Sequence, residues 1–110
     1  MEQLQSGTIT EGRLQEIVRR IVDAVPPEKI ILFGSAARGE MGPDSDVDLL
    51  VVKRCAHRRE TARGIRRKLI GIAVPIDIIV ATPEDLAAYG ETIGLIYRPV
   101  LQEGKEIYAA

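Results

Sequence analysis

Apolar residues recur along this chain with the spacings of helices and strands. Over residues 10–25 they are spaced by three and four positions, which predicts an amphipathic helix that starts at Thr10 as N-cap and stops at Pro26-Pro27. The apolar stripe of this helix consists of Leu14, Ile17, Val18, Ile21, Val22 and Val25. Residues 56–73 predict a second helix, weakened by Gly64 and Gly71, with its basic residues outward. Its inward positions are Ala62, Ile65, Leu69 and Ile72 or Ala73.

Short, dense apolar runs predict strands at residues 29–33, 46–52 and 74–80, because they are rich in β-branched residues and end at polar or glycine-containing segments. Pro75 lies near the start of the third run, which indicates an edge strand or the beginning of a strand.

The C-terminal third begins with Thr82-Pro83-Glu84-Asp85, which is typical of a helix start and predicts a short helix to about Tyr89. Residues 91–102 predict another helix, kinked or split by Pro99, and residues 105–108 a last short strand. This alternation predicts an α/β or α+β domain, a small β-sheet with helices on one or both faces.

Length and composition favour one globular domain. The chain has 110 residues, 45% of them hydrophobic, so we expect a single domain over residues 10–110 after a flexible N-terminus at residues 1–9. Cys55 is the single cysteine, which excludes an internal disulfide or a cysteine metal cage. The start of the chain carries no signal-peptide core and no apolar run approaches membrane-spanning length, so the expected compartment is the cytoplasm.

Charge is balanced overall but uneven along the chain. Fifteen Lys and Arg stand against sixteen Asp and Glu, which gives no argument for a nucleic acid or a membrane as partner. Residues 53–68, however, carry eight basic residues against Glu60. Such a face is usually solvated, but it could dock an acidic partner or a polyanion; the lack of interleaved aromatic residues disfavours single-stranded nucleic acid.

Three carboxylates are candidates for chemistry. Asp46 and Asp48 are two residues apart at a strand start and project from one face, while Asp77 lies in an apolar strand. Three acids on one small sheet would repel one another, and a divalent cation such as Mg²⁺ would resolve this. Taken singly, Asp46 could end a loop, Asp48 could face solvent and Asp77 could pair with an arginine of residues 53–68; these interpretations do not explain the three together.

The segment between the first two strands begins with Gly34-Ser35. Glycine permits close backbone approach, and a serine at a helix start can place its hydroxyl and free N–H groups around a phosphate. The alternative is a strand-to-helix turn with Ser35 as N-cap. Ten residues separate Ser35 from Asp46, enough for a helical turn and a return loop.

These residues together resemble a known family. The chain resembles the DNA polymerase β-like nucleotidyltransferases in the order of Gly34-Ser35, Asp46 and Asp48, and Asp77 in a later strand. It is similar in particular to their minimal (MNT) members, which pair with HEPN-domain toxins as antitoxins. The resemblance covers residues 14–108, nearly the whole chain.

The resemblance implies a role for each matching residue. Gly34 and Ser35 match the residues that hold the nucleotide triphosphate, and Asp46, Asp48 and Asp77 match the metal-binding and catalytic carboxylates. Arg38 matches an arginine that either assists phosphate binding or pairs with a nearby acid. The implied cofactor is Mg²⁺, as two ions, with ATP as substrate.

The implied reaction is transfer of AMP to a hydroxyl, a tyrosine of a partner HEPN toxin, which silences that toxin. Two other functions remain open: an antitoxin that neutralises its partner by binding alone, and a transferase acting on a small molecule such as an antibiotic. The sequence leaves open the oligomeric state and the nucleotide preference. His57 is expected to be a surface or capping residue, Cys55 a boundary residue, and Arg98 and Lys105 are not placed relative to the nucleotide.

Overall fold

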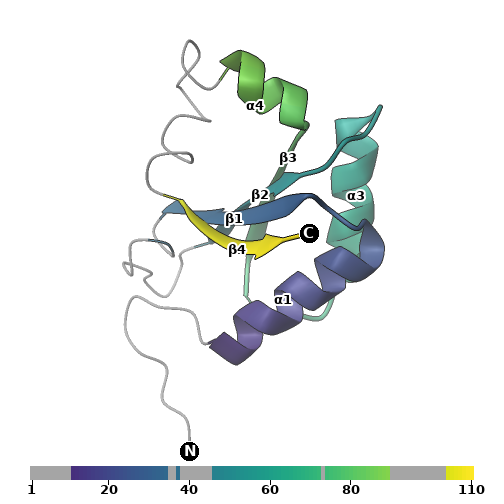
Figure 1. Cartoon of the computed structure of the whole chain (residues 1–110). Helices are drawn as coiled ribbons and strands as arrows, with labels where there is room; N and C mark the ends of the chain where they lie inside the picture. The colour runs from purple at the N-terminus through teal and green to yellow at the C-terminus, as the bar shows by residue number, and fades with distance from the viewer. Residues whose placement is uncertain (1–10, 35–36, 38–45, 73, 90–103) are drawn as a thin grey trace, which may run out of the picture.

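Helices and strands alternate along the chain much as the apolar pattern predicts. The computed structural model describes residues 11–34, 37, 46–72, 74–89 and 104–110. Its elements are α1 (Glu11–Ala24), β1 (Lys29–Phe33), β2 (Val47–Val52), α3 (Arg58–Lys68), β3 (Ile76–Ala81), α4 (Pro83–Tyr89) and β4 (Lys105–Ala109) (Figure 1). The predicted flexible N-terminus, the cap at Thr10 and the helix at residues 91–102 lie outside the described residues.

The four strands of the described part form one mixed sheet in the order β3-β2-β1-β4. Strand β1 pairs antiparallel with both β2 and β4, and β2 pairs parallel with β3. The predicted α/β class is therefore confirmed. Strand β3 lies at an edge of this sheet directly after Pro75, as the proline indicates.

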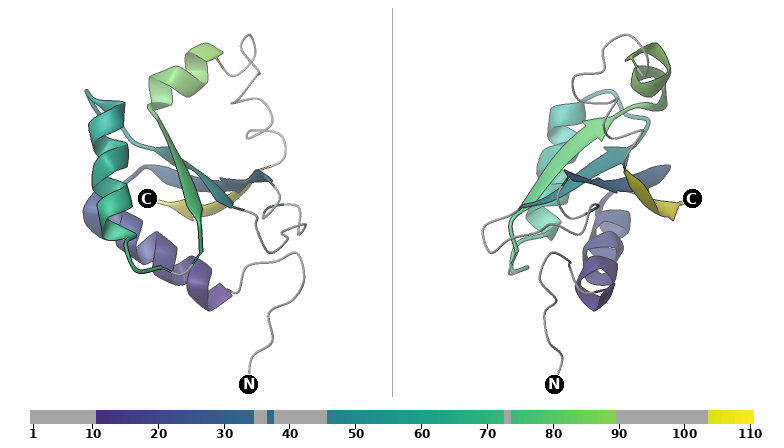
Figure 2. Two further views of the ribbon diagram at one scale, coloured as in Figure 1. Left: turned by 180° about the vertical axis from the view of Figure 1, so that it is seen from behind. Right: turned by 90° about the vertical axis from the view of Figure 1, so that its left-hand side faces the viewer.

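The two faces of the sheet carry separate apolar clusters, because side chains alternate along each strand. One face packs against α1 and α3, which lie together on that side (Figure 2). Its buried residues include Ile17 and Ile21 of α1, Ile65 of α3 and the central strand residues Val47, Leu49 and Val51. On the opposite face Ile31, Leu50, Val52 and Ala81 form a second, smaller cluster, on which Leu86 of α4 packs.

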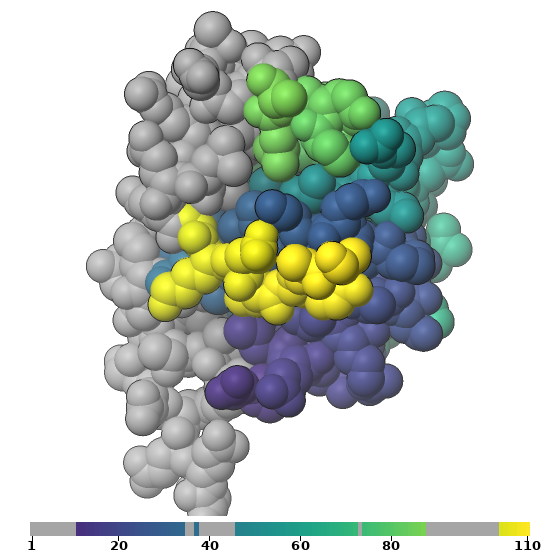
Figure 3. Space-filling view, viewed as in Figure 1, coloured from purple at the N-terminus to yellow at the C-terminus, as the bar shows by residue number. Residues whose placement is uncertain are grey.

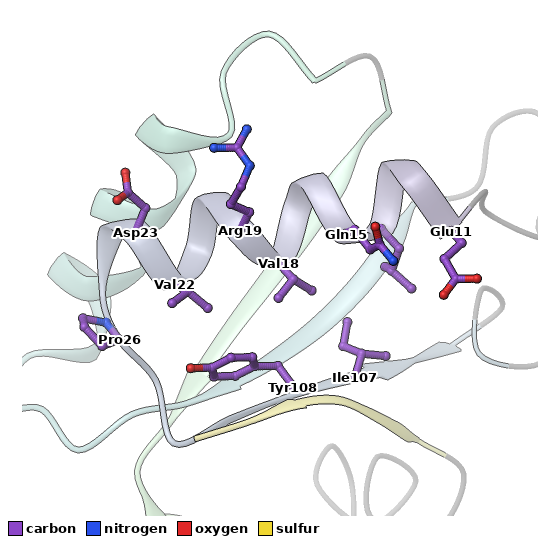
Figure 4. Close-up of a pocket in the computed structure, with 10 residues that line it drawn as sticks. Glu11, Gln15, Val18, Arg19, Val22, Asp23, Pro26, Ile107 and Tyr108 are labelled. Carbon is purple, nitrogen blue, oxygen red and sulfur yellow. The ribbon is translucent and has the colours of Figure 1, made fainter.

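Strand β4 is the edge strand that pairs with β1, and it lies next to α1. It runs along the front of the molecule between α1 and β1 (Figure 3). Between α1 and β4 a groove of about 1000 Å³ is lined by Val18 and Val22 on one side and by Ile107 and Tyr108 on the other (Figure 4). This groove belongs to the face that packs on α1.

Helix α3 is shorter than the predicted span of residues 56–73. It starts after His57, which occupies the N-cap position without a side-chain capping bond. At its end the N–H groups of Leu69 and Ile70 donate to carbonyls three residues back, at 3.1 and 3.4 Å, and Gly71 then adopts a φ of +97°. This tightened turn and left-handed glycine end the helix. Its predicted inward residues Ala62, Ile65 and Leu69 are buried as expected.

The predicted start of α4 is confirmed in atomic detail. The Asp85 N–H donates to Thr82 Oγ1 at 3.0 Å, and the Thr82 N–H donates to Asp85 Oδ2 at 3.0 Å, which is a reciprocal capping box. Asp85 also accepts a hydrogen bond from Arg58 of α3, so one carboxylate caps α4 and ties it to α3. The Thr82 N–H and the Arg58 guanidinium hold the pKa of Asp85 below its usual value.

No helix within the described ranges is long and apolar enough to cross a membrane.

Candidate active site

The candidate carboxylates lie where the end of β1 meets the starts of β2 and β3. Asp48 pairs directly with Asp77 across the parallel strands β2 and β3, and with Phe33, the last residue of β1, on its other side. Asp46 comes one residue before β2, which begins at Val47 rather than at residue 46 as predicted. The Val47 N–H donates to the Pro75 carbonyl at 2.9 Å, so Asp46 stands beside the start of β3. The structure thus brings the three acids to one end of the sheet.

Asp48 and Asp77 project from the same face of the sheet. Their strand neighbours Val47, Leu49 and Ile78 belong to the cluster under α1 and α3, so alternation places both aspartates on the other face. Neighbouring strands lie about 4.8 Å apart, which places paired carboxylates on one face within reach of one small cation.

Asp77 differs from its expected setting. The sequence places it in the middle of an apolar strand, where a carboxylate would be buried at high cost. In the structure β3 begins at Ile76, so Asp77 is its second residue, and its side chain is exposed at the edge of the sheet. Among the described residues, no ion pair joins Asp77 to an arginine. The arginines that form ion pairs in α3 and in the loop before it do so with other acids, as Arg58 does with Asp85.

Gly34 is held against Asp48. It directly follows Phe33, the residue paired with Asp48, and it adopts a φ of +74°. A Cβ atom at this position would lie 2.3 Å from Asp48 Oδ2, closer than non-bonded atoms can approach, and in a tight contact of 3.2 Å with its Cγ. Both the left-handed backbone and the closeness of the Asp48 carboxylate therefore favour glycine at position 34.

Two predicted site residues, Ser35 and Arg38, lie outside the described residues. Between them in the sequence, Ala37 is described, and it is buried in the cluster under α1 and α3.

The carboxylates do not form a complete metal cage by themselves. The described residues contain no group of three Asp, Glu, His or Cys side chains already arranged around one point. Mg²⁺ is commonly bound by one or two carboxylates together with substrate phosphates, so it does not need a complete protein cage. Asp48 and Asp77 on one face, with Asp46 beside them, supply oxygen donors of the type that suits this ion.

The weaker candidates lie elsewhere. His57 and Cys55 follow the C-terminal end of β2, whereas the acids lie at its start; His57 is exposed and Cys55 is partly buried against the core. Lys105 pairs with Leu32 near the candidate site, but Leu32 belongs to the face under α1, so Lys105 lies on the face opposite to Asp48. Arg98 is outside the described residues.

Sequence reasoning missed the apolar surroundings of the acids. Phe33 flanks Asp48 on β1, and Leu50 and Ile79 follow Asp48 and Asp77 on the same face as the next paired residues. The alternation within each strand shows which residues share a face with each acid. Which residues of other strands lie beside them depends on the strand pairing, which the sequence pattern does not show.

Comparison with known proteins identifies the family of this chain. Residues 13–106 match the model of the nucleotidyltransferase domain family, and the chain belongs to that family. No curated protein shows significant sequence similarity to it.

Solved structures show the same fold. A putative nucleotidyltransferase from Sulfolobus solfataricus aligns over 89% of this chain and 78% of its own, with 22% identity and a TM-score of 0.61. A mutant of the toxin–antitoxin MntA-HpeT aligns over 93% of this chain and 75% of its own, with 15% identity and a TM-score of 0.65. A toxin–antitoxin with AMP-PNP aligns over the same shares, with 20% identity and a TM-score of 0.61. The mixed sheet with its helices is thus a nucleotidyltransferase fold.

Proposed function

We propose that this domain transfers AMP from ATP to a hydroxyl group, a tyrosine of a partner HEPN-domain toxin, in a magnesium-dependent reaction, and that it thereby acts as an antitoxin. Membership of the nucleotidyltransferase family supports the type of reaction. The structural similarity to toxin–antitoxin proteins, one of them with AMP-PNP, supports the partner and the nucleotide.

The observation that carries the proposal is the direct pairing of Asp48 with Asp77, with Gly34 held against Asp48. A role in folding alone does not call for this arrangement, since two like charges paired across strands destabilise a sheet. The two carboxylates would instead be stabilised at this position by a cation that binds both of them together with the phosphates of a nucleotide.

Each residue then has a distinct task. Asp46, Asp48 and Asp77 would hold Mg²⁺ together with phosphate oxygens of ATP, as one or two ions. When bound, the metal supplies charge neutralisation of the triphosphate and lowers the pKa of the acceptor hydroxyl. Gly34 gives the phosphates close access to the backbone, and the hydroxyl of Ser35 binds them.

Asp77 is the proposed general base. Its exposed carboxylate can take the proton of the acceptor hydroxyl, whose oxygen then attacks the α-phosphorus of ATP. The bond between the α-phosphorus and the bridging oxygen breaks, and pyrophosphate leaves. Arg38, for which both interpretations stay open, would either bind the leaving phosphates or hold its own loop.

The test uses the purified domain, its partner toxin, labelled ATP and Mg²⁺. We expect label on the toxin with the wild-type domain and none with Asp48→Asn, since the amide cannot replace the carboxylate as a metal ligand. Asp23→Asn is the matched control, because Asp23 is an exposed residue of α1 that pairs with Lys68, at 3.3 Å, and the loss of its charge should leave transfer unchanged.

Two results would contradict the proposal. Wild-type transfer by a folded Asp48→Asn domain would remove Asp48 from the reaction. Full neutralisation of the toxin by Asp48→Asn without label transfer would show that the domain works by binding alone.

A further inference from the structure

The outer edge of β3 presents backbone groups that no strand of the described part satisfies. Pro75 and Ala81 direct their carbonyls toward β2, where they accept from the N–H groups of Val47 and Lys53, each at 2.9 Å. Because backbone groups alternate in direction along a strand, the N–H and carbonyl groups of Ile76, Ile78 and Val80 point away from β2, toward the outer edge. Arg66 Nη2 confirms this direction, because it donates to the Ile78 carbonyl at 3.4 Å.

A basic groove runs along this edge. It has a volume of about 400 Å³, and it lies between α3 and β3, which stand side by side (Figure 2). Its polar lining consists of Arg58, Arg59, Arg63 and Arg66. Arg58 is paired with Asp85, while Arg59 and Arg63 are exposed and form no ion pair with the described residues.

We propose that this groove binds an extended acidic segment of a partner protein, which adds to β3 as a further strand. The N–H and carbonyl groups of Ile76, Ile78 and Val80 would pair with the backbone of that segment. Carboxylates on the side of the segment that faces α3 would pair with Arg59 and Arg63. The proposal does not depend on AMP transfer, because it uses neither Asp48 nor Asp77.

The edge distinguishes a peptide from a nucleic acid. A peptide strand carries alternating donors and acceptors, which match both kinds of group on β3. The phosphate groups of a nucleic acid offer only acceptors, so they would leave the outward carbonyls of Ile76 and Val80 without partners.

Arg66 is the residue that must move. In the free domain its guanidinium donates a hydrogen bond to the Ile78 carbonyl, so this carbonyl in the middle of the edge is not available to an added strand. Charged residues at such edges also prevent unwanted association between sheets. When the acidic segment binds, Arg66 would leave this carbonyl and pair with a carboxylate of the segment. An uncharged strand offers Arg66 no such replacement partner, so it would bind less well.

The test measures binding of a fluorescent peptide of about eight alternating glutamate and valine residues, a length that matches a typical strand. We expect saturable binding that weakens with salt, and at least about tenfold weaker binding by the double variant Arg59→Glu/Arg63→Glu, because attraction becomes repulsion. The control is Arg67→Glu/Lys105→Glu, which makes the same change in net charge at exposed residues outside the groove. Hydrogen exchange should slow at the amides of Ile78 and Val80 and not at Leu50, which lies inside the sheet.

Three outcomes would overturn the proposal. One is no peptide binding by the folded wild-type domain, which would leave the arginines with a protective role only. Another is equal loss of binding in both double variants. The third is tighter binding of a uridine oligonucleotide of the same charge. Asp48→Asn should bind the peptide as the wild type does, so failure here and failure of the proposed transfer can be told apart.

Discussion

Replacing Gly34 by alanine tests the link between the backbone at the end of β1 and the carboxylate of Asp48. The added Cβ would lie 2.3 Å from Asp48 Oδ2, where an ordinary contact needs more than 3.4 Å. Asp48 must then turn away or β1 and β2 must separate. Because Phe33 and Asp48 are paired in the ladder, a rotation of the Asp48 side chain is the smaller change.

The expected magnitudes follow from these two effects. A φ of +74° costs an alanine about 1–2 kcal/mol relative to glycine, which lowers the melting temperature by roughly 5–15 °C in a domain of this size. Displacing a catalytic carboxylate by about 1 Å reduces the rate about 10²-fold. We therefore expect Gly34→Ala to fold with reduced stability and to transfer AMP at roughly 1% of the wild-type rate.

Two other glycines separate crowding from backbone strain. Gly71 has a φ of +97° but open space around the position of its Cβ, so Gly71→Ala should lower stability and leave transfer unchanged. Gly64 lies inside α3 with open space and an ordinary φ, so Gly64→Ala should raise stability by about 0.5–1 kcal/mol. The assay combines thermal unfolding with label transfer measured at a temperature where all variants are folded.

The reasoning is refuted if folded Gly34→Ala transfers at the wild-type rate. It is also refuted if Gly71→Ala loses as much transfer as Gly34→Ala, because the loss would then follow stability and not the position of Asp48.

Two further predictions concern stability. Thr82→Ala removes the hydroxyl that accepts from the Asp85 N–H and should lower the free energy of unfolding by about 1 kcal/mol, measured by urea titration, whereas Thr82→Ser should keep most of it. Hydrogen bonds from Arg19 and Arg20 lower the pKa of Glu16 from 4.5 to about 2, so its contribution to stability is complete above pH 4.5 and is lost as the pH falls through about 2. Melting curves between pH 6 and pH 2 should therefore show a smaller fall for Glu16→Gln than for the wild type, and equal falls would contradict this role of Glu16.

The ion pair of Glu16 also illustrates a structural connection that local pattern does not contain. Glu16 holds Arg20 Nε at 2.8 Å, and the same guanidinium donates to the carbonyls of Lys68 and Ile70 at 3.2 and 3.0 Å. The spacing of Glu16 and Arg20 along α1 is visible in the sequence. That Arg20 then fastens α1 to the turn after α3 follows only from how the two helices pack.

Much of the fold was determined by the sequence itself. The strand at residues 29–33 and the helix up to Pro26 were predicted closely, because apolar periodicity and proline act locally. The predicted helix start at Thr82 was right for the same reason, and the structure adds a capping box there. The errors fell at element ends, such as the last turn of α3, where the tightened turn and Gly71 end the helix sooner than the apolar spacing indicates.

The candidate site divides in the same way. The residue types and spacings of Gly34, Asp46, Asp48 and Asp77 were visible in the sequence, and period two placed Asp46 and Asp48 on one face. Only the tertiary structure decided that β2 and β3 are parallel neighbours in the register that pairs Asp48 with Asp77, and that Asp77 is exposed. Register depends on hydrogen bonds between segments far apart in the chain, and a shift of one residue would turn Asp77 to the opposite face. The sequence thus determined which groups the site contains, and the pairing of the strands decided that they meet.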